Sequence, residues 1–579
     1  MGLEDLVTAC EAAPDASAPL AALVQFCQEN LAATNTPLHH NIVKALADVA
    51  RTEVGRQKIL DTNLVVNICS VSWSRDTSLL VVEICRLGGN LCFDSPLGRE
   101  TVSQAGILRK LSEVVRGVQH EKVWVVLPSF LHNYCADNLQ CLNTVQQIAE
   151  VIAEHVANDE EAMESTDASG ECHPQVDEAA MESYASFLAG LSDHEGKQMF
   201  FKSNPIIRSI TKILCSSTSE ETISSVLDLL QELFEDEEVG NAYVENNVVD
   251  ILLKNINTWP PELVTSSLDL LALLSSHSSI LPRILNPTSP LHTEVTTWFT
   301  TQPSPHHTAT AALVYGNYCT TDENCLQLLS TTIPPVLVTL LSPSSPHKLL
   351  HAIIGCLRNL SVCQQAREQL IGLFLPEASC QLLLHISSGS DHTVTPKLLS
   401  TLRLVTQGDQ QSCIKIGRDG DLLKSLVKIA QISIVPALNI ETTRLLSSVI
   451  RYAKDSEVIE NVIENDVTPL LLGLLNSPHP QLINEMLVAL NLAAAKRPPT
   501  AKLVEQIDSE FLAAKLADIL AMENCPREIK CNAVTLVYNI MEWKSTSITE
   551  NFINSNLKQT ILNFDSESEI SKQVLGHLN

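Results

Sequence analysis

Six asparagines with similar surroundings are the side chains best suited to bind another molecule. They are Asn90, Asn133, Asn317, Asn359, Asn491 and Asn539. Each ends an apolar stretch and precedes a short polar connection. A carboxamide both donates and accepts hydrogen bonds, so a row of asparagines can bind the backbone of a partner in either direction. These residues therefore predict binding chemistry, in which no covalent bond changes.

The spacing of the asparagines predicts the elements that carry them. Asn90 and Asn133 are 43 residues apart, and Asn317 and Asn359 are 42 apart. The series also passes through positions that are not asparagine: Asp48, Ala189, Glu232, Ser275 and Leu404. A period of this length indicates a solenoid of helical repeats, each of which buries its apolar face against its neighbours. We call the series the ladder and expect it in the last helix of each three-helix repeat, along a concave groove.

A second role for each ladder asparagine is open at this point. The side chain can cap the end of its own helix or bond within its own repeat. Capping alone does not explain why the residue recurs in the same helical turn. The register of the six asparagines therefore favours lining of the groove.

The composition indicates the same fold class. Hydrophobic residues make up 45% of the 579 residues, aromatic residues only 4%, and regular β alternation is hard to find. We predict an all-α, right-handed superhelical solenoid that runs through residues 1–579 as a single array of about 12 to 13 repeats. Residues 158–176, NDEEAMESTDASGECHPQV, interrupt the array. Because this stretch is acidic and nearly free of large apolar side chains, it predicts a disordered insertion.

The charge of the chain points to basic partners. There are 67 Asp and Glu against 38 Lys and Arg, a net charge of −29. Such a surface repels nucleic acid and anionic membranes and attracts basic proteins. Between Lys212 and Lys254 there are ten acidic residues and no basic one. Glu232 lies in the ladder and Glu235 follows on the same helical side, so we expect this pair to bind a basic segment rather than to be only a solvated face.

The sequence predicts no enzyme, cofactor or metal site. It contains no GxxxxGK[ST], GxGxxG or GxSxG motif, and its histidine pairs lack metal ligands at suitable spacing. Seventeen cysteines include no CxxC pair. Six of them, which we expect to be buried free thiols, lie in apolar helical runs: Cys69, Cys85, Cys215, Cys319, Cys356 and Cys531.

No signal peptide and no apolar run of membrane length is present, so a soluble, cytosolic protein is expected. Association with the endoplasmic reticulum, mitochondria or nucleus stays open. We expect no direct contact with the membrane interior.

Several segments resemble one known family. They are GGNLCFDSPLGRETVSQAG, YGNYCTTDENCLQLL, CLRNLSVCQQAREQL and LLSTLRLVTQ, and together they are similar to the smg GDS family of small-GTPase GDP dissociation stimulators. The resemblance runs from about Leu46 to Met541. It implies an armadillo-repeat solenoid that binds Rho- and Rap-type GTPases with a basic, often prenylated, C-terminal tail. Members of the family act as chaperones and, for some partners, as nucleotide exchange factors.

The resemblance also implies roles for particular residues. The acidic region would attract the basic tail, and Asn317, Arg358 and Asn359 would hold the body of the GTPase. The complete set of expected groove residues is Asn90, Asn133, Glu232, Glu235, Asn317, Arg358, Asn359 and Asn491.

Two other armadillo functions compete with this prediction. An adapter of the importin-α type also binds basic peptides through an asparagine ladder, but it places Trp four residues before the asparagine. Those positions here are Arg86, Ser129, Leu313, Gly355, Leu487 and Thr535. A scaffold of the catenin kind has a basic groove for acidic ligands, the reverse of this charge balance.

Overall fold

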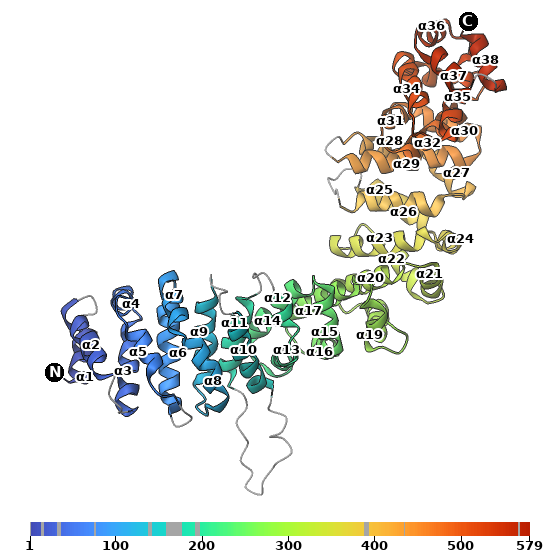
Figure 1. Cartoon of the computed structure of the whole chain (residues 1–579). Helices are drawn as coiled ribbons and strands as arrows, with labels where there is room; N and C mark the ends of the chain where they lie inside the picture. The colour runs from blue at the N-terminus through green and yellow to red at the C-terminus, as the bar shows by residue number, and fades with distance from the viewer. Residues whose placement is uncertain are drawn as a thin grey trace. The chain divides into compact units, whose positions relative to one another are not determined.

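The chain forms helices that assemble into two compact units. The computed structural model describes residues 2–12, 17–31, 36–73, 77–136, 142–157, 177–191, 197–386, 393–432, 435–565 and 568–578. The insertion expected at residues 158–176 lies outside them. Within the described ranges there is no strand, and the units are Met1–Glu294 and Val295–Asn579 (Figure 1). The all-α prediction is confirmed, whereas the prediction of a single array of repeats stays a prediction.

The first unit contains, in chain order, α1 (Leu3–Ala12), α2 (Ser17–Asn30), α3 (Thr36–Val49), α4 (Glu53–Leu60), α5 (Leu64–Ser70), α6 (Ser78–Cys92), α7 (Pro96–Ala105), α8 (Ile107–Val114), the 3-10 helix η2 (Val115–Gly117), α9 (Val123–Cys135), α10 (Leu142–Ala157), α11 (Glu178–Ala189), α12 (Lys197–Phe201), α13 (Asn204–Ser216), α14 (Glu220–Leu233), α15 (Glu237–Glu245), α16 (Val248–Ile256), α17 (Pro261–Ser275) and α18 (Leu281–Ile284). The division between the units falls within α19 (Pro290–Thr301).

The second unit continues with α20 (Pro305–Tyr318), α21 (Asp322–Leu329), α22 (Ile333–Leu340), α23 (His347–Val362), α24 (Gln364–Gly372), α25 (Leu375–Ile386), α26 (Thr395–Thr406), α27 (Gln410–Arg418), α28 (Gly420–Ala430), α29 (Pro436–Ala453), α30 (Ser456–Glu464), α31 (Thr468–Leu474), α32 (Pro480–Ala494), α33 (Ala501–Gln506), α34 (Ser509–Ala521), α35 (Arg527–Met541), α36 (Thr546–Ile553), α37 (Leu557–Asp565) and α38 (Glu569–His577).

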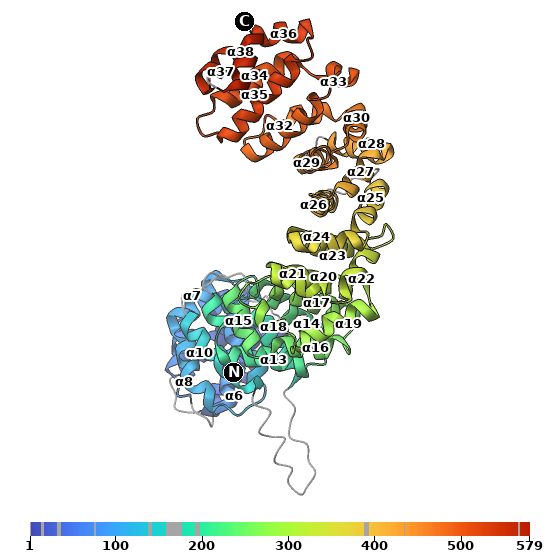
Figure 2. The same cartoon turned by 90° about the vertical axis from the view of Figure 1, so that its right-hand side faces the viewer.

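One row of helices in each unit carries the ladder. In the first unit each member packs against the next, in the order α3, α6, α9, α11, α14 and α17. In the second unit the row is α20, α23, α26, α29, α32, α35 and α38. Figure 2 shows α26 and α29 side by side, with α25, α27 and α28 to one side of them. Every ladder position named above falls in the last turn of one of these helices, so the period in the sequence places the row correctly.

Local sequence explains where these helices begin. α20 starts at Pro305, whose missing N–H costs nothing in the first turn, and the hydroxyl of Ser304 caps the helix by accepting a hydrogen bond from the His307 N–H at 3.4 Å. Pro261 and Pro290 are likewise the first residues of α17 and α19, although α17 has no side-chain cap.

Small residues allow neighbouring ladder helices to approach closely. A Cβ added to Gly316 of α20 would lie 3.4 Å from the Cα of Cys356 on α23. A Cβ added to Gly88 of α6 would lie 2.8 Å from the ring of Phe130 on α9. Close packing between neighbouring repeats stabilises a solenoid, because each repeat buries its apolar face against the next.

The cysteine prediction is partly wrong. Cys85, Cys319 and Cys356 are buried free thiols, as expected, but Cys215 and Cys531 are exposed. In α13 the buried residues Ile206, Ile207, Ile210, Ile213 and Leu214 form a helical stripe. Cys215 follows this stripe in sequence but points away from it, because a helix turns by about 100° at each residue.

Candidate functional site

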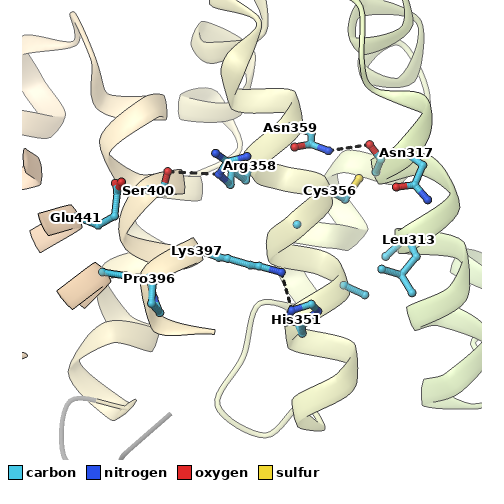
Figure 3. A pocket seen from close by; sticks show the side chains of 15 residues that line it. Leu313, Asn317, His351, Cys356, Arg358, Asn359, Pro396, Lys397, Ser400 and Glu441 are labelled. Carbon is cyan, nitrogen blue, oxygen red and sulfur yellow. Dashed lines mark hydrogen bonds between the residues drawn. The ribbon is translucent and has the colours of Figure 1, made fainter. Parts of the chain in front are cut away.

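A groove crosses the ladder helices of the second unit and contains three of the expected residues, Asn317, Arg358 and Asn359 (Figure 3). The cavity has a volume of about 510 Å³. It is lined by Ala312, Leu313, Gly316, Asn317, His351, Ala352, Gly355, Cys356, Arg358, Asn359, Pro396, Lys397, Ser400, Ala437 and Glu441. These residues belong to α20, α23, α26 and α29, so four successive ladder helices build one surface.

Helix α23 supplies the centre of the groove. His351, Gly355 and Arg358 lie about one turn apart and share a face, whereas Ile353 and Leu357 are buried on the opposite side. A Cβ added to Gly355 would meet no other heavy atom within 4 Å. The missing side chain at this position therefore gives the groove part of its depth.

Positive groups are prominent along the groove. Arg358 is exposed, and its Nε donates to the Ser400 hydroxyl at 3.4 Å (Figure 3). Lys397 Nζ lies 2.6 Å from His351 Nε2, so the ammonium donates to an unprotonated imidazole nitrogen. Burial, together with the nearby charge of Arg358, lowers the pKa of Lys397. This end of the groove suits a ligand that offers hydrogen-bond acceptors.

The acidic residue of the groove is already paired. Glu441 accepts hydrogen bonds from Arg403 at 3.2 Å and from Arg444 at 3.3 Å. Its negative charge is therefore balanced within the second unit. The groove presents the cations of Arg358 and Lys397 above a floor of small residues.

The ladder asparagines bridge neighbouring repeats. Their side-chain Nδ2 atoms donate to backbone carbonyls of the preceding ladder helix: Asn90 to Ala47 at 2.8 Å, Asn133 to Gly89 at 3.1 Å and Asn359 to Gly316 at 2.9 Å. Carbonyls in the last turn of a helix often lack a partner within that helix, and the next repeat supplies one to Ala47 and Gly316. The Gly89 carbonyl accepts from Asn133 in addition to the Phe93 N–H at the end of α6. The carboxamide oxygens of these three residues accept no hydrogen bond from the described residues, so their contact with a partner stays a prediction.

Asn491 makes a different set of bonds. Its Nδ2 donates to the Asn532 carbonyl, and its Oδ1 accepts from Asn539 Nδ2, each at 2.9 Å. Both polar ends of the carboxamide are thus engaged by α35. A partner would have to displace one of these bonds to contact Asn491.

We expect Asn359→Ala to lower the free energy of unfolding by about 1 kcal/mol, because the Gly316 carbonyl loses its donor. Urea denaturation measures this change. Asn476 is a matched control, since it is exposed after α31 and its side chain makes no hydrogen bond to a described residue. Equal stability of Asn359→Ala and Asn476→Ala would show that the bridge adds nothing.

Exposed carboxylates gather on α14 and α17 of the first unit. Glu221, Asp228 and Glu232 follow one face of α14, and Glu262 lies on the adjacent α17. Glu235 lies in the turn after α14, two residues beyond Leu233, so the expectation that it shares a helical side with Glu232 is wrong. We call these five residues the acidic surface. All are exposed, and their carboxylates have no hydrogen-bond or ion-pair partner among the residues that the structure describes.

The other acids next to Glu235 have structural roles. Asp236 caps α15 through hydrogen bonds of 2.9 and 3.0 Å from the backbone, and Glu238 forms an ion pair. Glu237 accepts from the Ser279 N–H at 2.9 Å, and hydrogen bonds from Ser279 lower the pKa of Glu237. Within this acidic run, only Glu235 is unpartnered in the described part of the chain.

The two units differ in charge. Residues 1–294 hold 41 Asp and Glu against 17 Lys and Arg, a net charge of −24. Residues 295–579 hold 26 against 21, a net charge of −5. The attraction for basic ligands therefore belongs mainly to the first unit.

Sequence reasoning missed several groove residues. His351, Lys397 and Ser400 line the groove but were not expected there. Ser400 is 42 residues after Arg358, which is one repeat period, so the spacing contained a signal for this pair. His351 and Lys397 are 46 residues apart and give no such signal.

The described residues provide neither a metal-binding cluster nor a single helix of membrane length. Among the described residues, no group of three or more His, Cys, Asp or Glu side chains could hold a metal ion. No single described helix is long and apolar enough to cross a membrane; α24 and α25 reach that length only as a pair bent by 74°.

Comparison with known proteins reveals relatives that match most of the chain. Rap1 GTPase-GDP dissociation stimulator 1-B of Xenopus laevis is 24% identical over 525 residues, covering 86% of this chain and 82% of that protein. The GTPase-GDP dissociation stimulator vimar of Drosophila melanogaster is 22% identical over 458 residues, covering 73% of this chain and 67% of that protein. The resemblance to the smg GDS family is confirmed. Because the similarity covers 86% of this chain, it includes parts of both units. No family model matches the chain.

A solved structure from work on the interaction between cadherin and beta-catenin has a similar fold. It has a TM-score of 0.52 and 15% identity, and covers 78% of this chain and 88% of that one. At this identity the likeness concerns the fold alone. With the helical rows described above, it confirms the predicted armadillo architecture.

Proposed function

We propose that this protein binds small GTPases and stimulates the release of GDP. The observation that carries the proposal is the similarity, along 86% of the chain, to proteins named GTPase-GDP dissociation stimulators. Such exchange makes and breaks no covalent bond. A binding protein that holds the nucleotide-free GTPase more tightly than the GDP-bound form shifts the population toward release.

The acidic surface supports a role in binding the C-terminal tail of the GTPase. Its carboxylates are exposed and unpaired in the described part, and the surrounding unit carries a net charge of −24. A polybasic tail of the Rho or Rap type has the complementary charge. Within the same proposal, a tail that also carries a prenyl group would be held away from membranes, which is a chaperone function exercised in the cytoplasm.

The groove of the second unit supports contact with the GTPase body. Arg358 is exposed and makes one long hydrogen bond, so its guanidinium can donate to a partner at little cost. The carboxamide of Asn359 keeps its oxygen available, and Asn317 lies beside it. These groups would bind backbone and acidic side chains of a segment near the nucleotide.

The tail contribution is tested by titration with a Rap1-type GTPase, intact or lacking its basic tail. We expect the intact GTPase to bind more tightly at low salt, and the difference to shrink as salt screens the acidic surface. Equal affinities at low salt would contradict the proposed role of the tail. Equal binding of the isolated tail peptide and the whole GTPase would instead favour an adapter for basic peptides.

A further inference from the structure

A second, smaller cavity lies in the second unit between α26, α29 and α32. Its volume is about 50 Å³, which suits one small chemical group. The lining residues are Arg403, Gln407, Arg444, Ser447, Ser448, Arg451, Tyr452 and Glu485. Three of these eight side chains are guanidinium groups, in a chain whose net charge is −29.

One of the three arginines is fully occupied by carboxylates. Arg444 binds Glu485 through two hydrogen bonds, of 2.8 and 3.0 Å, and binds Glu441 at 3.3 Å. This fork arrangement also occupies both oxygens of Glu485. The two carboxylates therefore offer little to a cation from outside.

Arg403 is only partly satisfied. Its Nε donates to Glu441 at 3.2 Å, but its two terminal amino groups contact no acceptor among the described residues. The side chain is 14% exposed, and this burial is the main cause that lowers the pKa of Arg403. Arg403 lines the cavity, so its terminal amino groups can donate to an acceptor placed there.

The other groups around the cavity are also hydrogen-bond donors, and Gln407 and Arg451 among them are exposed. Ser448 is 9% exposed, and its hydroxyl has no partner within the described ranges. The amide oxygen of Gln407 accepts from Arg367 at 3.2 Å, which leaves its amino group unpaired in the described part. Arg451 lies 5.3 Å from the ring of Tyr452 and pairs with no described carboxylate.

We infer that this cavity binds one oxyanion, either a carboxylate or a phosphoryl group, through Arg403, Arg451 and Ser448. Three guanidinium groups against the carboxylates of Glu441 and Glu485 leave one uncompensated positive charge for the anion. Planar guanidinium groups match both kinds of oxyanion with paired hydrogen bonds. A cavity of about 50 Å³ has room for one such group.

The oxyanion site adjoins the candidate groove. Glu441 lines the groove, and both Arg403 and Arg444 bind its carboxylate. A partner in the groove could therefore place an acidic or phosphorylated side chain in the cavity. Only this last step rests on the proposed function; the anion site itself does not.

Calorimetric titration of the full-length protein with inorganic phosphate, and separately with acetate, tests the inference at constant ionic strength. We expect saturable binding that Arg451→Gln weakens by about tenfold or more, because a charge-assisted pair of hydrogen bonds is lost. Arg451 is exposed and unpaired in the described part, so folding should survive. Lys428→Gln, which removes an exposed and unpaired charge from α28, should leave binding unchanged.

The outcomes separate the sources of the anion. Tighter binding of phosphate identifies a phosphoryl site, whereas equal or tighter binding of acetate identifies a carboxylate site. Absence of saturable binding for both, or equal weakening by Lys428→Gln, would overturn the inference. Because no GTPase is used, failure here is distinct from failure of the proposed function.

Discussion

Replacement of Glu232 and Glu235 by lysine is expected to weaken binding of a GTPase with a basic tail by about tenfold at low salt. Each substitution removes an attraction and adds a repulsion at the centre of the acidic surface. Both side chains are exposed, and their carboxylates are unpartnered in the described part, so the melting temperature should change little. Fluorescence anisotropy with a labelled GTPase measures the affinity.

The control for this experiment must change the net charge equally. Glu523 and Glu528 are exposed in the second unit and also lack ion-pair partners among the described residues. Their double replacement by lysine should reduce affinity far less. Similar losses in both double variants would mean that overall charge, and not the acidic surface, attracts the tail.

Gly355→Leu is expected to abolish binding of the GTPase body while leaving the fold intact or more stable. The new side chain would extend into the groove, since no heavy atom lies within 4 Å of the added Cβ. Removal of a glycine from the interior of α23 should itself raise the free energy of unfolding by about 0.5–1 kcal/mol. Urea denaturation and a binding titration on the same sample measure both effects.

Gly473→Leu is the matched control for the groove. Gly473 lies within α31, also has open space around an added Cβ, and does not line the groove. It should give a similar gain in stability with normal binding. Unimpaired binding in Gly355→Leu would contradict the assignment of the groove as a contact site.

The sequence predicted the ladder helices well because their signal is local and periodic. Apolar spacing marks each helix, and a step of 42 or 43 residues carries Asn90 to Asn133 and Asn317 to Asn359. The same logic placed Glu232 in the last turn of α14. Regular repeats allow such extrapolation because each repeat packs against a neighbour of the same kind.

The roles of the asparagines could not be predicted from this pattern. Asn359 donates to the Gly316 carbonyl of the preceding repeat, a contact between residues 43 apart in sequence. The pattern in the sequence suggests only a partner or the asparagine's own repeat as the group that binds the carboxamide. Which carbonyl is reached depends on how closely α20 and α23 pack, and that distance depends on small residues such as Gly316.

The polar groups around the two cavities were harder still to foresee. Arg403 directly precedes the ladder position Leu404, as Arg358 precedes Asn359, yet one arginine is partly buried beside Glu441 and the other is exposed. Their surroundings depend on the next helix in the row, which supplies a carboxylate to one and a serine to the other. Counting charges identifies an acidic chain, but it does not predict that arginines line the two cavities of the second unit.

Release of a fluorescent GDP analogue from a purified Rap1-type GTPase tests the central claim most directly. The proposal predicts that the full-length protein accelerates release, and that both Gly355→Leu and the Glu232→Lys, Glu235→Lys double variant reduce this acceleration. The effect of the double variant should vanish for a GTPase without its basic tail. No acceleration by the unmodified protein, for GTPases with or without the tail, would contradict the proposal that it stimulates GDP release.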